Sequence, residues 1–421
     1  MISKPTRQQL EWQRAEYGMF CHFGLNTFNG KEWSDGTLSP ETFDPARLDA
    51  LQWVEVAQAA GMNYLIVTAK HHDGFCLWPS DTTDYSVKSS PYKDGKGDVV
   101  GEVAEACRNA GMKFGLYLSP WDRHEPSYPD AEAYDVFYQQ QLTELCTRYG
   151  PLFEVWFDGA GSVGRTYDWD SIMAVVNEHQ PEAMVFNMGR PTIRWVGNED
   201  GLAADPNGYV VGELPGTGTY TDAQLAAEPR YIPPECDVSI RRGWFWHPQE
   251  LGTIKTLEHL LGIYYRSVGL GANLLLNVPP NRDGLIDKAD VTRLLELRQN
   301  LDTRFAEPLS GTLEQKGSTV RLEFGEPVRF DHLVLEEGLS DGQKIFEHRI
   351  SSDSHTLIVK GGTVGHKRFH VFPEIQSTSL TLELADPDAR LKAVSAYATG
   401  FSTLPEVTER VHDPATAAMV D

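Results

Sequence analysis

The feature that most limits what this chain can fold into is a unit that occurs three times in its first 160 residues. Each unit has an amphipathic helix, a glycine, a short apolar strand and a polar cluster. The helices are expected to end at Gly61, Gly111 and Gly150, because glycine readily adopts the left-handed conformation that terminates a helix. Helices that alternate in this way with apolar strands are typical of a parallel sheet covered by helices.

Polar residues stand at the ends of at least four of the predicted strands. A parallel barrel collects its reactive groups at the carboxyl ends of its strands, so we predict a (β/α)8-type barrel rather than an open doubly wound sheet. No GxGxxG motif follows any strand, which argues against a dinucleotide site. Outside the three units, strands are expected at 17–21, 183–187, 238–240 and 273–278, and helices at 249–268 and 287–305.

The last part of the chain has a different pattern. Apolar and polar residues alternate strictly at 319–324 and 380–384, as they do in strands with one buried face. Shorter strands are expected at 332–337, 355–359 and 391–397, and this spacing is typical of an antiparallel β-sandwich. We therefore predict a catalytic barrel over residues 1–308, a sandwich over 309–401 and a polar tail over 402–421.

The charge balance narrows the range of partners. Lys and Arg total 37 against 60 Asp and Glu, which gives a net charge of −23. Such a chain repels phosphate backbones and anionic membranes, so we expect no nucleic acid and no membrane as partners, and a neutral substrate fits better. No apolar run has the form of a signal peptide or is long enough to span a bilayer. The five cysteines show no CxxC spacing, so we expect free thiols and a cytoplasmic location. The oligomeric state is not indicated.

Asp158 is the first candidate for the residue that performs the chemistry. It follows the apolar stretch 152–157, which predicts a short inner strand. A buried charge without partners is costly, whereas the end of a barrel strand is where catalytic groups gather. From the sequence alone, a structural role for Asp158 as a strand-end cap or half of an ion pair stays open.

The other strand-end clusters combine aromatic rings with histidines, carboxylates and amides. Aromatic faces beside directional hydrogen-bonding groups suit a polyhydroxylated ring, so a sugar is the natural ligand. His71, His72 and Asp73 also suggest a metal site. Adjacent residues at a strand end point in different directions, however, so we favour hydrogen bonding to a ligand over metal binding. The remaining clusters contain His22, Glu32, Trp33, Tyr117, Trp121, Asp122 and the run 241–247.

Hydrolysis of a sugar linkage requires two carboxyl groups. One is ionised and attacks the anomeric carbon or positions water, while the other stays protonated and gives its proton to the leaving oxygen. Asp158 fits the first role. Residues 200–234 are rich in Gly, Pro, Asp and Thr without a regular period, and we expect them to form one wall of the site. For the second role, spacing does not choose among Glu199, Glu213 and Glu235.

Five motifs together carry a family resemblance: 17–24 (YGMFCHFG), 32–33 (EW), 70–75 (KHHDGF), 156–159 (WFDG) and 274–280 (LLLNVPP). They resemble the α-L-fucosidases of glycoside hydrolase family 29. The similarity extends over the whole barrel, and the His-His-Asp-Gly and Phe-Asp-Gly motifs are the most specific. The stretches 194–199, 237–241 and 330–337 resemble the subgroup that acts on α-1,3- and α-1,4-linked fucose.

This resemblance implies a retaining exo-α-L-fucosidase that needs no metal or other cofactor. Its partner would be a branched, Lewis-type oligosaccharide, from which it would release terminal fucose through a covalent fucosyl-enzyme intermediate. Asp158 would be the nucleophile and Glu199 the general acid/base. The positions that match the family's fucose-binding set are His22, Glu32, Trp33, His71, His72, Tyr117 and Trp244.

Three alternatives stay open on the sequence. The enzyme could be a broad-specificity fucosidase that also takes α-1,2 or α-1,6 linkages. The chain could instead be a fucose-binding protein that kept the barrel and lost turnover, or a metal-dependent hydrolase that uses His71, His72 and Asp73. The sandwich is expected to buttress the barrel and shape the rim of the site rather than to bind sugar.

Overall fold

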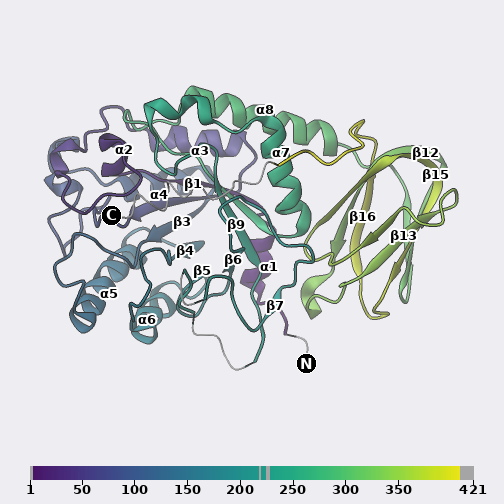
Figure 1. Cartoon of the computed structure of the whole chain (residues 1–421), viewed down its shortest axis with the longest axis horizontal. Coiled ribbons are helices and arrows are strands. Elements are labelled where there is room, and N and C mark those ends of the chain that lie inside the picture. The colour runs from purple at the N-terminus through teal and green to yellow at the C-terminus, as the bar shows by residue number, and fades with distance from the viewer. Residues whose placement is uncertain (1–2, 218–219, 224–227, 408–421) are drawn as a thin grey trace.

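A computed structural model of the chain describes residues 3–217, 220–223 and 228–407. A parallel sheet surrounded by helices forms one part of the molecule, and long antiparallel strands form the other (Figure 1). The fold class predicted from the sequence is confirmed: an α/β barrel is followed by an antiparallel β-structure. Within the described residues, no helix is both long and apolar enough to cross a membrane.

The barrel is nearly closed. Its eight strands pair in the order β5-β4-β3-β2-β1-β10-β9-β6, and every pairing between them is parallel. A parallel bridge between Phe186 and Ile193 brings the two end strands together. The strands are β1 Tyr17–Cys21, β2 Tyr64–Lys70, β3 Lys113–Leu118, β4 Glu154–Trp156, β5 Met184–Phe186, β6 Arg194–Trp195, β9 Pro234–Ser239 and β10 Asn273–Asn277.

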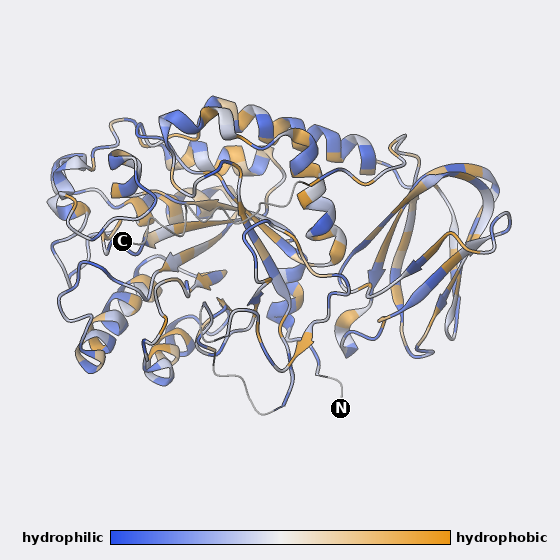
Figure 2. Cartoon of the chain, viewed as in Figure 1, coloured by the Kyte–Doolittle hydropathy of each residue, from blue (hydrophilic) through white to orange (hydrophobic). Residues whose placement is uncertain are grey.

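The helices cover the outside of this barrel. Three of them end where the sequence predicts, because Gly61, Gly111 and Gly150 have φ of 79°, 69° and 83°, values that favour glycine. Their apolar faces pack on the outer face of the strands, and Figure 2 shows polar residues on the exposed helix faces. The helices are α1 Arg7–Gln13, α2 Leu25–Asn29, α3 Ala50–Ala59, α4 Val99–Ala110, α5 Ala131–Arg148, α6 Trp169–His179, α7 Leu257–Arg266 and α8 Lys288–Phe305.

Two predictions for the barrel are wrong in detail. The helix expected at 249–268 is a 3-10 turn, Pro248–Thr253, followed by α7. Thr256 is the N-cap of α7, because its side chain accepts a hydrogen bond from the backbone N–H of His259 over 3.2 Å. The α-helix therefore starts only after the 3-10 turn. The strand expected at 238–240 begins four residues earlier, at Pro234. Glu235 and Asp237 lie inside the barrel. Because these side chains are polar, the strand has no apolar run by which the sequence could predict it.

The C-terminal part is a sheet folded into two layers around one core. The strands β12 Thr319–Glu337 and β15 Arg368–Leu384 run through both layers, with register shifts near Glu323 and Phe330. The remaining strands are β11 Thr312–Lys316, β13 His348–Ser352, β14 Val359–Gly361 and β16 Leu391–Tyr397. The strand expected at 355–359 is wrong, because the Ser352 hydroxyl accepts the N–H groups of Ser354 and His355 and closes a turn there.

The sandwich packs directly on the barrel through α7 and the turn after it. The Tyr265 hydroxyl lies 2.9 Å from Nε2 of His332 on β12. The Phe305 ring at the end of α8 packs against Phe369, with centroids 4.9 Å apart. Figure 1 shows α7 between the barrel strands and the sandwich. The boundary at 308/309 stays a prediction, as does the polar tail, of which residues 408–421 lie outside the described residues.

Candidate active site

Asp158 lies directly beyond β4, at the carboxyl end of the barrel. Both of its oxygens have donors: the Tyr117 hydroxyl donates to Oδ2 over 2.9 Å and the backbone N–H of Ala160 donates to Oδ1 over 2.8 Å. The side chain is nevertheless 23% exposed. The carboxylate is therefore oriented and still open to solvent, unlike a buried strand-end cap.

His72 lies beside Asp158, with Nε2 3.7 Å from Oδ2. Burial lowers the pKa of His72 to about 4, although the charge of Asp158 works in the opposite direction. The pair is therefore no ion pair at neutral pH. The Ser119 hydroxyl donates to the carbonyl of Trp121 and so accepts from Nδ1 of His72 over 2.7 Å. Neutral His72 thus presents an unprotonated Nε2, which can accept a hydrogen bond from a hydroxyl group.

His22, at the end of β1, is arranged in the same way. Its Nδ1 lies 2.9 Å from Oδ1 of Asn277, the last residue of β10. The amide nitrogen of Asn277 donates to the carbonyl of Trp244, so the amide oxygen faces His22 and Nδ1 carries the proton. Burial lowers the pKa of His22 to about 3. His22 and His72 therefore both offer Nε2 as an acceptor.

Aromatic rings surround these histidines. The rings of His71 and His72 are 4.1 Å apart, and His71 stacks on Tyr117 at 5.7 Å. Trp33 meets His72 edge-on at 5.4 Å, and Trp244 lies 5.0 Å from His22. Both tryptophans are half-buried. They leave ring surface available beside the hydrogen-bonding groups, as a sugar requires.

Glu32 is held by the loop that carries Trp244. The backbone N–H groups of Trp244 and Phe245 donate to its two oxygens over 2.7 and 3.3 Å. Burial raises the pKa of Glu32 to about 7, and the charges of Glu250 and Glu199 add to this effect. The structure thus brings all seven residues of the predicted fucose-binding set to one end of the barrel.

Glu199 follows β6 on the same side and is exposed. Its charge acts on a second carboxyl that the sequence did not single out, Asp237 of β9. Burial raises the pKa of Asp237 well above its usual range, and the charges of Glu199 and Asp158 raise it further. Trp195 donates its indole N–H to Asp237 over 2.8 Å. Asp237 therefore lies within the electrostatic reach of both proposed catalytic carboxyls.

The other two acid candidates differ sharply in position. Glu213 is exposed in the turn after β7 (Val210–Val211). Glu235 is fully buried in the barrel, where it accepts hydrogen bonds from Tyr64 and Trp156 over 2.8 and 3.1 Å. It pairs in register with Asn273, the first residue of β10, so it belongs to the layer at the amino ends of the strands. Glu235 cannot reach a substrate beside Asp158.

Residues 220 and 221 of the irregular segment 200–234 lie against the site, as expected. A Cβ atom on Gly159 would lie 1.5 Å from the carbonyl oxygen of Tyr220, so only glycine fits after Asp158. Asn187 clamps the same segment: its amide donates to the carbonyl of Tyr220 over 2.9 Å and accepts from Thr221 over 2.8 Å. The segment therefore packs against the turn that carries Asp158.

The residues proposed for a metal site do not converge. Nδ1 of His72 is used by Ser119, and Oδ1 of Asp73 accepts the N–H of Phe75 over 3.1 Å. Nδ1 of His71 is buried without a hydrogen-bond partner. In the part of the chain that the structure describes, no group of three or more His, Cys, Asp or Glu side chains is arranged to hold a metal ion.

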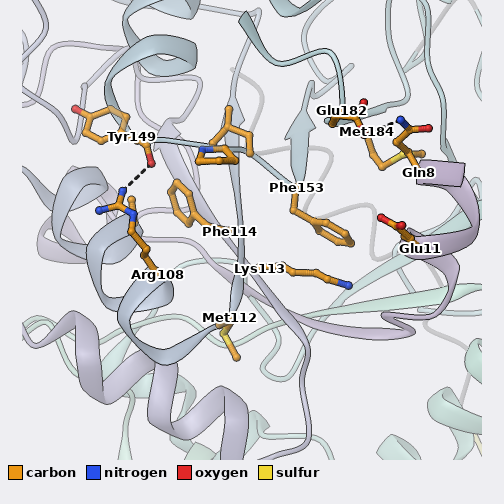
Figure 3. A pocket seen from close by; sticks show the side chains of 13 residues that line it. Gln8, Glu11, Arg108, Met112, Lys113, Phe114, Tyr149, Phe153, Glu182 and Met184 are labelled. Carbon is orange, nitrogen blue, oxygen red and sulfur yellow. Dashed lines mark hydrogen bonds between the residues drawn. The ribbon is translucent and has the colours of Figure 1, made fainter.

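A pocket of about 340 Å³ lies at the opposite end of the barrel (Figure 3). It opens beside the first residues of β3 and β5, Lys113 and Met184, and Lys113 lies over the ring of Phe153 at 4.7 Å. The predicted site residues do not line this pocket. Barrel enzymes place their chemistry at the carboxyl ends of strands, so we assign the site to the end that holds Asp158.

Asn277, Asp237 and Ser119 belong to the site, although the sequence did not single them out. A signal existed for Asn277, which is a polar residue at the end of the apolar run 274–276, and such a residue inside a barrel needs a partner. Ser119 lies in a loop, where no period marks it, and Asp237 lies in β9, which has no apolar run.

An oriented carboxylate among neutral imidazoles and open tryptophan faces, at the carboxyl end of a parallel barrel, defines the class of barrel glycoside hydrolases. The comparisons with known proteins agree. The family model for alpha-L-fucosidase matches residues 37–304. Alpha-L-fucosidase 1 of Arabidopsis thaliana is 38% identical over 458 residues, which cover 96% of this chain and 89% of the plant protein.

Solved structures are similar over almost the whole chain. A glycoside hydrolase 29 family member from an unknown rumen bacterium has a TM-score of 0.87 at 35% identity and covers 98% of this chain and 79% of that chain. A Ruminococcus gnavus GH29 fucosidase in complex with fucose has a TM-score of 0.83 at 31% identity and covers 97% of each chain. The chain belongs to the α-L-fucosidases of glycoside hydrolase family 29 and is a glycoside hydrolase.

Proposed function

We propose that this α-L-fucosidase hydrolyses its substrate with retention of configuration, with Asp158 as nucleophile and Glu199 as general acid/base. The observation that carries the proposal is the state of Asp158: donors hold both of its oxygens, and the carboxylate still faces solvent at the end of β4. A nucleophile needs this combination of fixed orientation and access.

The reaction proceeds in two steps. In the first, an oxygen of Asp158 bonds to the anomeric carbon, the glycosidic bond breaks, and Glu199 gives its proton to the departing oxygen. In the second, Glu199 takes a proton from water, the water oxygen bonds to the anomeric carbon, and Asp158 leaves as a carboxylate. Two inversions at one carbon return the original α configuration.

Binding of the fucose ring is assigned to His22, Glu32, Trp33, His71, His72, Tyr117 and Trp244. The unprotonated Nε2 atoms of His22 and His72 accept hydrogen bonds from ring hydroxyls, and burial keeps both imidazoles neutral. The tryptophan faces cover the apolar side of the ring that bears the methyl group. No step of this chemistry requires a metal.

The proposed substrates are branched, Lewis-type oligosaccharides with terminal α-1,3- or α-1,4-linked fucose. Support comes from the stretches 194–199 and 237–241, whose sequences resemble that subgroup; they supply β6, Glu199 and the buried Asp237 of β9. We also propose a reducing, cytoplasmic location, because all five cysteines are buried and unpaired.

Proton NMR of the earliest product tests the stereochemistry. Retention predicts that α-L-fucose forms first and then mutarotates, whereas β-L-fucose as the first product would refute the proposal. A panel of oligosaccharides with α-1,2, α-1,3, α-1,4 and α-1,6 linkages tests the substrate class. Comparable kcat/KM for all four would favour a broad-specificity fucosidase instead.

A further inference from the structure

The chain that follows Glu199 runs onto the sandwich. Between Glu199 and Asp205 there is little free length. The Asn198 side chain closes the turn, because its oxygen accepts the N–H groups of Asp200 and Leu202 over 3.1 and 3.3 Å. Its amide group donates to the carbonyl of Leu202 over 2.8 Å. Glu199 therefore sits on a compact turn whose position depends on where the next residues are fixed.

The barrel fixes one side of this turn. Gly201, with φ of 75°, packs so closely on Val238 of β9 and Ile263 of α7 that a Cβ atom would lie 2.8 and 2.9 Å from them. The N–H of Ala203 donates to the carbonyl of Arg266 over 2.9 Å. These contacts set the path of the chain as far as residue 203.

The sandwich fixes the rest through one buried glutamine. Gln343 is fully buried. Its oxygen accepts the N–H of Tyr209 over 2.9 Å and its amide donates to the carbonyl of Asn207 over 3.1 Å. Thr363 accepts the N–H of Asn207 over 2.8 Å. The N–H groups of Asn207 and Tyr209 and the carbonyl of Asn207 are thus bonded to the sandwich. The side chains of the same two residues donate to the barrel-side carbonyls of Leu270 and Gly271, so this segment joins the two parts.

An ion pair adds a second attachment. Both terminal nitrogens of Arg368, on β15, donate to the two oxygens of Asp205 over 2.7 Å each. The Arg368 side chain is only 9% exposed. A bidentate pair of this kind fixes direction as well as distance, so it sets the orientation of the segment six residues after Glu199.

The same segment is tied back to the strand that precedes Glu199. Arg194 of β6 donates from Nη2 to the side-chain oxygen of Asn207 and the carbonyl of Gly208, both over 3.2 Å. The strand before Glu199 is therefore connected through Arg194 to residues 207 and 208, in the segment that the sandwich helps to hold.

We propose that the C-terminal sandwich contributes to catalysis by positioning Glu199. Arg368 and Gln343 are the positioning residues, because they hold the 198–209 segment and thereby the carboxyl of Glu199. The inference rests on the proposed role of Glu199 as general acid/base. It goes beyond a buttressing role, because it predicts a specific defect in acid catalysis when the attachment is weakened and the barrel stays intact.

The test compares two substrates whose need for the acid differs. A 2-chloro-4-nitrophenyl α-L-fucoside has a leaving group that departs without protonation, whereas an α-fucosyl disaccharide needs a proton on its leaving oxygen. For Arg368→Gln, kcat/KM for the disaccharide should fall about tenfold or more while that for the aryl fucoside changes less than about twofold. Arg368→Lys should recover part of the loss.

Lys367→Gln is the matched control. Lys367 is the neighbour of Arg368 and also pairs with the barrel, but its partner is Glu16, ahead of β1, at 2.6 Å. The control should lower kcat/KM for both substrates by less than about twofold, because it weakens the same interface without touching residues 198–209. Hydrogen exchange in 198–209 should rise for Arg368→Gln and not for Lys367→Gln.

Asp205→Ala removes the same ion pair from its more exposed side, which keeps the test open if Arg368→Gln fails to fold. Equal losses on both substrates in folded variants, or an Arg368→Gln profile that matches Lys367→Gln, would overturn the inference. Glu199→Gln in the same assay distinguishes a failure of this inference from a failure of the proposed role of Glu199 as the acid. If it is selective and Arg368→Gln is not, only the inference fails; if Glu199→Gln is unselective, the assignment of the acid fails and the inference falls with it.

Discussion

The hydroxyl of Tyr117 donates a hydrogen bond to Oδ2 of Asp158 over 2.9 Å, across neighbouring strands of the barrel. Tyr117 is itself fixed by stacking on Trp156, with centroids 5.4 Å apart. Burial raises the pKa of Tyr117 well above its usual range, and the charge of Asp158 raises it further. The phenol therefore stays protonated and serves as a permanent donor that aims one oxygen of Asp158.

Replacement of Tyr117 by phenylalanine tests this relationship. A hydrogen bond to a charged group contributes about 1.5–3 kcal/mol, so Tyr117→Phe should lower kcat/KM about 10- to 100-fold with the fold intact. Tyr138→Phe is the control: Tyr138 is equally buried, but its hydroxyl donates to the backbone carbonyl of Leu118 over 2.8 Å. Similar activity losses in the two variants would mean that the effect is a general one of buried tyrosines.

Removal of the proposed acid should depend on the leaving group. For Glu199→Ala, kcat/KM for an α-fucosyl disaccharide should fall about 100-fold or more, with a much smaller effect on an activated aryl fucoside. Azide should then accelerate turnover of the aryl fucoside and yield the α-fucosyl azide, because it attacks the intermediate without general base assistance. Glu213→Ala is the control, since Glu213 is the other exposed glutamate among the three candidates. A larger loss in Glu213→Ala than in Glu199→Ala would exchange the two assignments.

The buried pair Glu154 and Glu235 should make stability depend on pH. Burial raises the pKa of Glu154 well above its usual range and that of Glu235 to about 7, and a hydrogen bond between the two carboxyls lets Glu154 hold the proton. The folded state thus binds protons that the unfolded state has released above pH about 4.5. Each such proton lowers the free energy of unfolding by about 1.4 kcal/mol per pH unit as pH rises, until the folded-state pKa is passed.

Glu154→Gln replaces the carboxyl group by an amide of the same shape. The amide donates a hydrogen bond at every pH, so the variant should fold. Its Tm should decline less than that of the wild type between pH 6 and 9, as measured by thermal melts monitored by circular dichroism. The exposed Glu182 provides a control in Glu182→Gln, which should follow the wild-type curve. An unchanged or steeper decline in Glu154→Gln would show that the pair is not the group that titrates.

Chelation should leave activity unchanged. Ser119 and the backbone N–H of Phe75 already occupy one potential ligand atom each of His72 and Asp73. Among the described residues, no three His, Cys, Asp or Glu side chains are arranged to hold a metal ion. Dialysis against EDTA should therefore preserve kcat/KM. A loss that added Zn²⁺ or Mn²⁺ restored would instead support a metal-dependent hydrolase.

The sequence predicts the barrel well where the pattern is local. Glycines with positive φ end three helices, and Asp158 follows its strand as expected. The sequence does not predict structure well where a residue's partner is distant along the chain. Asp237 and Glu235 make β9 look irregular, because their hydrogen-bond donors, Trp195 and Tyr64, lie on other strands. The attachment of residues 205–209 to Gln343 and Arg368 is equally hidden, since its partners are more than one hundred residues away.

Glu235 illustrates the same limit at the site. In the sequence it is one of three glutamates near the irregular segment, and spacing cannot rank it. The direction of its side chain decides the matter: Glu235 alternates with its neighbours along β9 and points into the barrel toward Tyr64. The predicted fucose-binding residues converge because they all stand at strand ends or in the loops that follow, which is a property of the barrel itself.

Covalent trapping tests the central claim most directly. A 2-deoxy-2-fluoro-α-L-fucosyl fluoride forms the intermediate quickly and releases it slowly, because the fluorine at C2 destabilises both transition states and fluoride departs readily. Mass spectrometry of a proteolytic digest of the inactivated enzyme should find one fucosyl adduct, on the peptide that contains Asp158, and none in Asp158→Asn. A label on Glu199, Glu32 or another side chain, or turnover to β-L-fucose without any adduct, would contradict the account.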